Sequence, residues 1–215
     1  MASTGKRKNS SGEETRSRII DATLTTLKTE GIVGTSARNI AKAGDFNQAL
    51  VFYHFGSVDE LVIAAVADMS RTRLENYRPR LEAVTTLTEM VAVARELHVE
   101  DVRDDNMKVL TQAFAGAVGN PDVGPKLYAE LDPWSDLVGE TVERVLADVP
   151  AAAAIDKAQI AQAVSSLFLG IELLDGLDST RSNADALLET LEGLSRLLEL
   201  VLQMPGLQGL AKSGS

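Results

Sequence analysis

Polar side chains able to read DNA bases gather between residues 35 and 54. The amide of Gln48 can donate and accept at once, which matches N6 and N7 of adenine, and Asn47 can do the same or serve only as a helix cap. The guanidinium of Arg38 can reach a guanine edge with two hydrogen bonds, and a plain surface charge is the alternative. These residue types predict a surface that recognises base sequence, with Gln48 as its strongest member.

Two short helices joined by a tight turn are expected to hold this surface. The first would begin at Thr35 or Ser36, whose hydroxyl can accept from free backbone N–H groups. Gly44 and Asp45 mark the break, and Asn47 opens the second helix. The first helix would bury residues at helical spacing, namely Ala37, Ile40 and Ala41. This is the pattern of a helix-turn-helix, whose second helix enters the major groove of DNA.

The second helix also carries residues with other expected roles. Ala49 and Leu50 could meet a thymine methyl group, while Tyr53 and His54 would touch phosphate oxygens. A histidine beside aromatic residues is also often a packed side chain, so His54 is a weaker candidate than Gln48. The expected core residues are Val51, Phe52 and Phe55. The expected DNA contacts are Thr35, Ser36, Arg38, Asn47, Gln48, Ala49, Leu50, Tyr53 and His54.

The segments TSARNIA, FNQALVFYHF and SVDEL resemble the N-terminal domain of TetR-family transcriptional regulators, over about residues 13–67. The resemblance implies an all-α fold. Its N-terminal three-helix helix-turn-helix domain would span 13–67, and a C-terminal helical effector-binding and dimerisation domain would span 68–204. Three positions depart from the family pattern: Asp45 replaces a turn glycine, Phe52 replaces a phosphate-contacting tyrosine, and Val58 replaces a lysine.

The two ends of the chain are expected to lie outside these domains. Residues 1–12 have almost no apolar side chains, which predicts a disordered basic arm, and residues 205–215 would form a flexible tail. The arm follows the phosphate backbone, enters a minor groove, or is only a solvated tail, because the Lys-Arg-Lys run at 6–8 does not distinguish these roles. The helix after the arm would open at a capping box of Ser11 and Glu14 and stop at Gly31.

Apolar residues keep helical spacing through the rest of the chain. A helix would open at a capping box of Ser57 and Glu60 and end near Pro79. Further helices are expected at 81–98, 104–118, 125–146, 156–174 and 183–204. No segment alternates apolar and polar residues over the length of a strand, which predicts a body made only of helices.

The last two helices are apolar over more than one narrow stripe. They match the pair that forms a four-helix dimer interface in the proteins that this chain resembles. The alternative is that they only complete the core of one subunit. A twofold dimer would place two recognition helices on a palindromic site, roughly 34 to 36 Å apart. The expected interface residues are Leu167, Gly170, Ile171, Leu174, Leu187, Leu191, Leu194 and Leu198.

The resemblance also implies a pocket in the body for a small-molecule effector of unknown identity. The candidate lining residues are large or polarisable side chains of the expected middle helices. Simple packing in the core is the alternative for each of them. They are Met90, Leu97, His98, Met107, Leu110, Phe114, Tyr128, Trp134 and Phe168. Glu172 lies inside an apolar run, where its carboxylate would reach solvent, contact a partner across the dimer, or meet a cationic ligand.

Composition excludes several classes of protein. The chain has no cysteine and two histidines, which argues against disulfides, thiol chemistry and a zinc site. No Gly-rich phosphate loop, metal-spaced histidine pair or serine nucleophile motif is present, so an enzyme is not expected and no cofactor is called for. No secretory signal is recognisable and no segment was expected to reach membrane-span length, which predicts a cytoplasmic protein.

The charge is unevenly distributed. Residues 1–56 carry eight Lys or Arg against five acids, a net charge of +3, so the remainder carries -13 of the total of -10. A basic head can dock on phosphates while an acidic body discourages indiscriminate binding. The prediction is a dimeric DNA-binding regulator, most often a repressor in this family. The alternative is a helical effector-binding or interaction module that no longer reads DNA.

Overall fold

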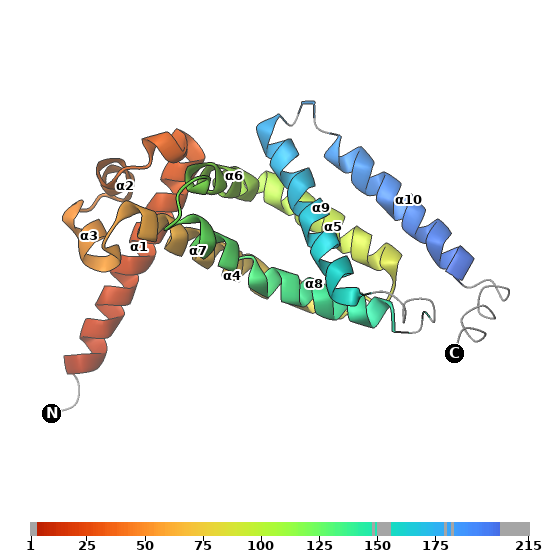
Figure 1. Ribbon diagram of the computed structural model, residues 1–215. Helices are drawn as coiled ribbons and strands as arrows, with labels where there is room; N and C mark the ends of the chain where they lie inside the picture. Colours follow the sequence, from red (N-terminus) through yellow and green to blue (C-terminus); the bar gives the residue numbers. More distant parts are fainter. Residues whose placement is uncertain (1–3, 148, 150–155, 179, 182, 203–215) are drawn as a thin grey trace. The chain divides into compact units, whose positions relative to one another are not determined.

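The computed structural model describes residues 4–147, 149, 156–178, 180–181 and 183–202, with side chains from Gly12 onward. Its secondary structure is helical, and no strand occurs in these ranges, which confirms the all-α prediction (Figure 1). The helices are α1 (Thr4–Gly34), α2 (Ala37–Gly44), α3 (Ala49–Phe55), α4 (Val58–Glu82), α5 (Leu87–Arg103), α6 (Asn106–Ala117), α7 (Gly124–Ala129), α8 (Asp132–Val145), α9 (Lys157–Leu177) and α10 (Ala184–Leu202).

The chain forms two compact units. The first comprises Met1–Thr72 and Asp105–Glu130, and the second comprises Arg73–Asp104 and Leu131–Ser215. The first unit therefore contains the expected DNA-binding domain together with α6 and α7. The predicted domain boundary lies near residue 67, whereas the first segment of the compact unit runs to Thr72. The predicted tail at 205–215 lies outside the described residues.

The first unit has an apolar core built from α1 to α4 and α6. Ile19, Ile40, Val51 and Leu61 are fully buried in one cluster, and a second cluster joins α1, α4 and α6. The side-chain oxygen of Gln112 on α6 accepts the backbone N–H of Ile32 at 2.9 Å. This bond satisfies a donor that the break in α1 would otherwise leave unpaired.

Helix α1 differs from its prediction at its start and agrees with it at its end. It begins at Thr4, so residues 4–12 are helical and Ser11 is an interior residue instead of a cap. No proline interrupts this stretch, and a helix that has already nucleated extends by one hydrogen bond per residue. At the other end, Gly31 has φ 68°, which breaks the helix where the glycine stop was predicted.

Two prolines had other effects than predicted. Helix α4 runs through Pro79 and ends at Glu82, so the expected boundary at the proline is three residues early. The expected helix over 125–146 is instead split into α7 and α8. Pro133 lies in the first turn of α8, where its missing N–H is tolerated and its fixed φ favours a new helix start.

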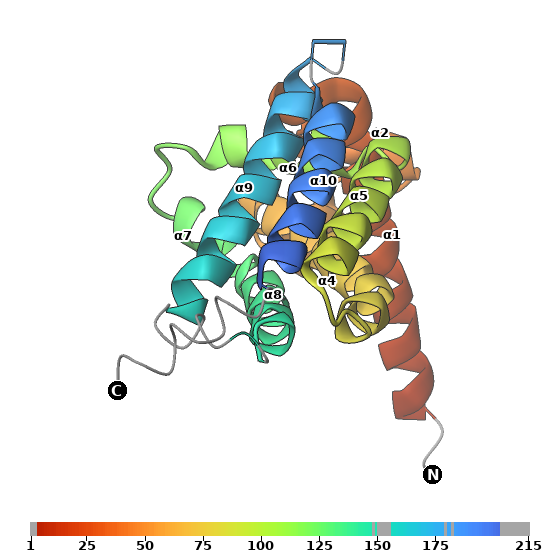
Figure 2. The same ribbon diagram turned by 90° about the vertical axis from the view of Figure 1, so that its right-hand side faces the viewer.

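The second unit is a bundle of α5, α8, α9 and α10 with the C-terminal part of α4 (Figure 2). Helix α9 packs along α8, and α10 packs along α5. Glu199 on α10 accepts from the backbone N–H of Thr88 at 2.8 Å and from its hydroxyl at 3.0 Å. Thr86 caps α5 by accepting the N–H of Glu89 at 3.1 Å. These contacts fix the α5–α10 pair near one end.

Helix α9 is long and apolar enough to span a membrane, with 21 residues and a mean hydropathy of 1.4 over its most apolar window. The prediction that no segment reaches this length is therefore wrong for α9. A core or interface helix passes the same test of length and composition. Helix α9 packs along α8 and buries Glu172 fully, but only 17% of its apolar window is buried among the described residues.

Candidate functional site

The turn between α2 and α3 has the geometry of a helix-turn-helix. Ser36 caps α2 by accepting the N–H of Asn39 at 3.3 Å, as predicted. Asp45 ends α2 in the left-handed conformation with φ 52°, and its carbonyl accepts from Nη2 of Arg18 at 2.8 Å. Aspartate tolerates this conformation better than most residues. The departure from glycine at this position is therefore compatible with the turn.

The second helix begins two residues later than predicted. Helix α3 starts at Ala49, and Oδ1 of Asn47 accepts the N–H of Ala49 at 2.8 Å. Asn47 thus lies one residue before the N-cap Gln48, is exposed, and satisfies the N–H of Ala49 with its side chain. Gln48 makes no capping bond and its side chain is exposed. Its amide is available to a partner outside the protein.

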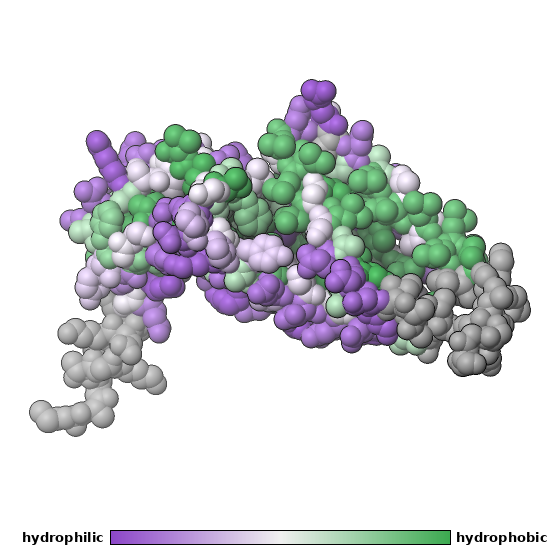
Figure 3. Space-filling view, viewed as in Figure 1, coloured by the Kyte–Doolittle hydropathy of each residue, from purple (hydrophilic) through white to green (hydrophobic). Residues whose placement is uncertain are grey.

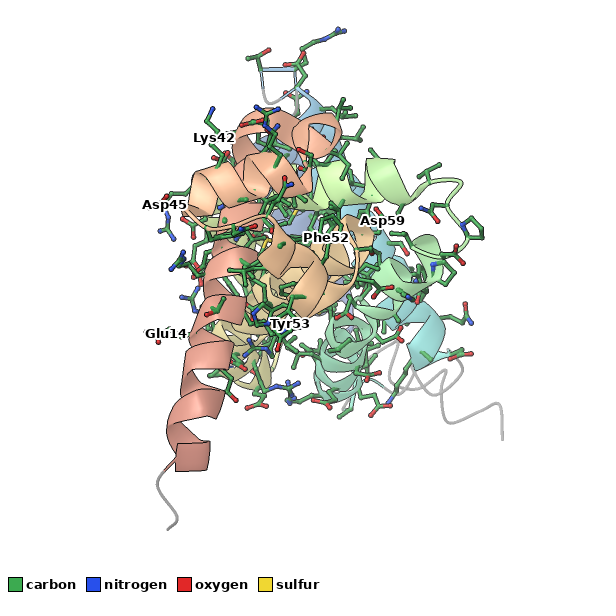
Figure 4. The ribbon with its side chains drawn as sticks, turned by 90° about the vertical axis from the view of Figure 1, so that its left-hand side faces the viewer. Glu14, Lys42, Asp45, Phe52, Tyr53 and Asp59 are labelled. Carbon is green, nitrogen blue, oxygen red and sulfur yellow. The ribbon has the colours of Figure 1, made fainter. Side chains whose placement is uncertain are left out.

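One side of α3 is exposed and carries Gln48, Ala49, Phe52 and Tyr53. These positions are i, i+1, i+4 and i+5, which share one helical face. Phe52 and Tyr53 are labelled on α3 in Figure 4, and Tyr53 is 81% exposed. The buried side holds Val51, which is fully enclosed by the core. We refer to the exposed four residues as the α3 outer face.

The structure corrects two residues of this helix. Phe52 was expected in the core but is 52% exposed, because it lies one turn after Gln48 on the same face. Leu50 was expected to contact DNA but is half-buried and packs against the core. Phe55 is half-buried against the same core, as predicted, and half-buried His54 meets the edge of Tyr53 with ring centroids 5.0 Å apart.

The other predicted contacts lie at the start of α2. Ser36 and Arg38 are exposed, whereas Thr35 is half-buried and its hydroxyl donates to the carbonyl of Gly31 at 2.8 Å. That bond leaves the oxygen of Thr35 able to accept but uses its proton. Two basic residues were missed by sequence reasoning. Arg16 and Arg18 on α1 are exposed and lie over the rings of Phe55 and Phe46, at 4.7 and 5.7 Å from the ring centroids.

A second group of functional candidates lies in the second unit and is polar and buried. Arg73 on α4 forms an ion pair with Asp101 on α5, and Nδ1 of His98 lies 2.8 Å from Oε1 of Glu172. The guanidinium of Arg73 also lies over the ring of Trp134, 5.1 Å from its centroid. We call the four residues Arg73, Asp101, His98 and Glu172 the buried polar cluster. Sequence reasoning missed Arg73 and Asp101, which are 28 residues apart.

The candidate effector residues divide between the two units. Leu97, Trp134 and Phe168 pack together beside the buried polar cluster, and His98 belongs to it. Met90 packs in a separate cluster of the second unit. The remaining four lie in the first unit, where Met107, Leu110 and Phe114 fill its core and Tyr128 is exposed. For these three core residues, the packing alternative holds.

Burial and pairing change the acid strength of both members of the His98–Glu172 pair. The hydrogen bond to Glu172 raises the pKa of His98 above its ordinary 6.5. Burial raises the pKa of Glu172 above its ordinary 4.5. Both groups therefore hold their protons more tightly in the folded chain than in the unfolded one.

This pair is expected to make the protein less stable as the pH rises. From about pH 4.5 to above pH 6.5 the folded chain binds more protons than the unfolded chain, so the free energy of unfolding falls with increasing pH. Urea unfolding of the wild type and of Glu172→Gln, at about pH 5 and about pH 8, measures this. The glutamine variant should lose less stability over the interval, since it removes one titration and weakens the other. Equal losses in both proteins would contradict the assignment.

The expected dimer residues are mostly exposed in one subunit. Leu167 and Leu174 on α9 and Leu187, Leu194 and Leu198 on α10 are between 42% and 66% exposed. Figure 3 shows hydrophobic side chains gathered over these two helices. Gly170 is half-buried, and a Cβ built on it would meet nothing within 4 Å. Ile171 and Leu191 differ, because both pack between α9 and α10 inside the subunit.

No group of three or more His, Cys, Asp or Glu residues that could hold a metal ion occurs in the part of the chain that the structure describes. The buried ionisable side chains of the second unit form ion pairs and hydrogen bonds with one another instead, as in the buried polar cluster.

Comparisons with known proteins agree with this geometry. Residues 19–65 match the model of the bacterial regulatory proteins of the tetR family, which covers α2, α3 and their flanks. No curated protein sequence matches the chain. Similar folds occur in the fatty acid degradation regulator FadR of Bacillus halodurans, with 14% identity and a TM-score of 0.69 over 83% of this chain and 96% of that one.

Two further structures have bound ligands. FadR of Bacillus subtilis in complex with stearoyl-CoA is 14% identical with a TM-score of 0.66, over 82% of this chain and 95% of that one. A candidate transcriptional regulator from Saccharomonospora viridis in complex with choline is 17% identical with a TM-score of 0.67, over 84% and 95%. The matched segment coincides with the helix-turn-helix and its supporting helices. Residues 19–65 therefore carry a match to the bacterial regulatory proteins of the tetR family, and the chain as a whole shares its fold with the regulators named above.

Proposed function

We propose that this protein is a dimeric, sequence-specific DNA-binding transcriptional regulator, a repressor released by a small-molecule effector. The observation that supports it best is the α3 outer face, where Gln48 is exposed beside Ala49, Phe52 and Tyr53. An amide that has no hydrogen bond to the described residues, at the start of a recognition helix, can read adenine in the major groove. Its action would be binding and release of DNA in the cytoplasm, without a catalytic step.

Basic residues around this face would supply the phosphate contacts. Arg16, Arg38 and Lys42 are exposed on α1 and α2. They can offset the absence of a lysine at Val58 and of a tyrosine hydroxyl at Phe52, because phosphate contacts position the protein without reading sequence. Phe52 itself can contact a thymine methyl group or a sugar.

A second copy of the chain is the proposed partner of the exposed leucines of α9 and α10. Leu167 and Leu174 are seven residues apart, as are Leu187 and Leu194, and this spacing keeps side chains on one line when helices pack nearly parallel. A monomer would leave this row in water, which soluble proteins seldom do over a large patch. A dimer would present two α3 outer faces to a palindromic operator.

The effector would act by binding the DNA-competent and DNA-incompetent states with unequal affinity. Stearoyl-CoA and choline in two proteins of similar fold support a ligand site in the helical body of this chain as well. Those two ligands differ widely in size and charge. The chemistry of the effector must therefore come from this chain's own residues.

Selection from a random DNA library with the purified protein tests the proposed function. An enriched inverted repeat supports both sequence reading and the dimer, and the absence of any enriched sequence contradicts regulation by operator binding. The selected site should keep its preference over random DNA as salt weakens the phosphate contacts.

Replacing Gln48 with alanine should weaken binding to the selected site by about 1 to 3 kcal/mol and leave binding to random DNA nearly unchanged. Tyr53→Phe is the matched comparison, since it removes one hydroxyl from the same face and should weaken all sequences alike. Gel-shift or anisotropy titrations of both DNAs measure the difference. An equal loss on both DNAs for Gln48→Ala would remove it from the residues that read sequence.

A further inference from the structure

The buried polar cluster contains two hydrogen-bonding atoms that the protein leaves unused. Glu172 is fully buried, and its Oε1 is bound to His98 while its Oε2 has no partner among the described residues. Nε of Arg73 is likewise buried without a partner there, although Arg73 is paired with Asp101. A buried polar atom without a partner costs about 1 to 3 kcal/mol, so two of them in one cluster call for an explanation.

The two unused atoms belong to one contiguous group. Arg73 is paired with Asp101, which lies one turn after His98 on α5, and His98 is bonded to Glu172. Arg73 and Asp101 both act electrostatically on Glu172. One of the unused atoms is an N–H donor and the other is a carboxyl oxygen. A single bound group with one acceptor and one donor could satisfy both.

The charges in this cluster offset one another. The guanidinium of Arg73 is balanced by Asp101, and Glu172 shares a hydrogen bond with His98. A cation would meet the positive charge of Arg73, and an anion would meet two carboxyl groups. Burying an unbalanced charge is costly, so an uncharged polar group fits best.

Beside the cluster lies an apolar wall with an exposed edge. Leu97 and Leu137 are buried there, while Trp134 and Phe168 pack against them and are only half-buried. Aromatic side chains of this kind bind flat apolar groups with offset or edge contacts. A ligand could therefore rest its apolar part on these rings and direct its polar end to the cluster.

We propose that the second unit binds an uncharged ligand that has an apolar, preferably aromatic, body and a polar end carrying both a hydrogen-bond donor and an acceptor, such as a primary amide. Oε2 of Glu172 receives the donor, and Nε of Arg73 donates to the acceptor. This assignment rests on the proposed function, in which it gives the chemical class of the effector. The alternative is that the cluster only stabilises the fold, in which case water and no ligand would bind Oε2 of Glu172 and Nε of Arg73.

Four probes of one shape distinguish the possible ligand chemistries: benzamide, benzylamine, benzoate and toluene. Trp134 is the single tryptophan of the chain, so its indole N–H gives one NMR signal beside the proposed site. Benzamide should shift this signal in a saturable manner, with a Kd on the order of 1 mM for a ligand of this size. The other three probes should bind at least tenfold more weakly. Tighter binding of benzylamine or benzoate, or no binding of benzamide, overturns the proposal.

Glu172→Met tests the assignment of the oxygen, because methionine has a similar volume and offers no acceptor of comparable strength. This variant should bind benzamide at least tenfold more weakly. It also leaves buried His98 without its partner, so its melting temperature should fall, and binding is measured at a temperature where circular dichroism shows that the variant is folded. Glu189→Gln, at an exposed position on α10, is the control and should bind benzamide as the wild type does. Unchanged benzamide affinity in Glu172→Met contradicts the proposal.

The DNA-library selection separates this inference from the proposed function. Benzamide binding by a protein that selects no operator would support the ligand site and contradict regulation. An enriched operator together with no benzamide binding would support regulation and overturn the ligand class.

Discussion

Replacing Leu194 and Leu198 together with lysine is expected to convert the proposed dimer into a monomer and to lower operator affinity more than a hundredfold. Both leucines are about half exposed in one subunit, and four of them would be buried in a twofold dimer. Each buried leucine contributes about 1.5 to 3 kcal/mol, and a lysine placed there adds a desolvation cost. Sedimentation equilibrium and titration of the selected operator measure the two effects.

Val118→Lys is a suitable control for this experiment. It also replaces an exposed apolar residue by lysine, but at the position directly after α6 in the first unit. It should remain a dimer with unchanged operator affinity. A double leucine variant that stays dimeric would show that the row of leucines on α10 is not the interface.

Arg73→Met is expected to lower the free energy of unfolding by about 3 to 5 kcal/mol. The substitution leaves the carboxylate of Asp101, which is 1% exposed, without its balancing charge, and it removes the guanidinium from the ring of Trp134. Urea unfolding followed by circular dichroism gives the difference.

Arg71→Met is the matched comparison for this variant, two residues earlier on the same helix. Arg71 is paired with Asp68, but the side chains are 60% and 38% exposed, so water replaces the lost contact. Its removal should cost about 1 kcal/mol or less. A similar small loss in Arg73→Met would mean that the buried pair contributes as little as the exposed one.

The helix-turn-helix was predictable from sequence because its signals are local. The hydroxyl cap at Ser36 and the break at Asp45 are decided by neighbouring backbone groups, and both occur in the structure. Asn47 accepts the N–H of Ala49 as expected of a capping amide, but the N-cap position itself is Gln48. The error at Phe52 has a simple cause. An aromatic residue was assigned to the core by type, although its spacing of four from Gln48 places it on the exposed face.

The polar cluster of the second unit was only partly predictable. Glu172 drew attention because a carboxylate inside an apolar run needs a partner, and His98 was a candidate by type. Their pairing, across 74 residues, depends on how α5 and α9 pack, which no local pattern encodes. The same holds for Arg73 and Asp101. Met107 and Leu110 were predicted to line the effector pocket from their side-chain type alone, and the structure places both in the core of the first unit.

The left-handed aspartates set a narrow limit on how this protein can evolve. Asp45 and Asp105 have φ of 52° and 55°, a conformation that costs most L-residues about 1 to 2 kcal/mol and β-branched ones more. Among natural replacements, glycine and asparagine should be the ones accepted at both positions. In a library of variants selected for correct folding, aspartate, asparagine and glycine should therefore be the residues recovered at these two turns. Neighbouring exposed positions should accept many residue types.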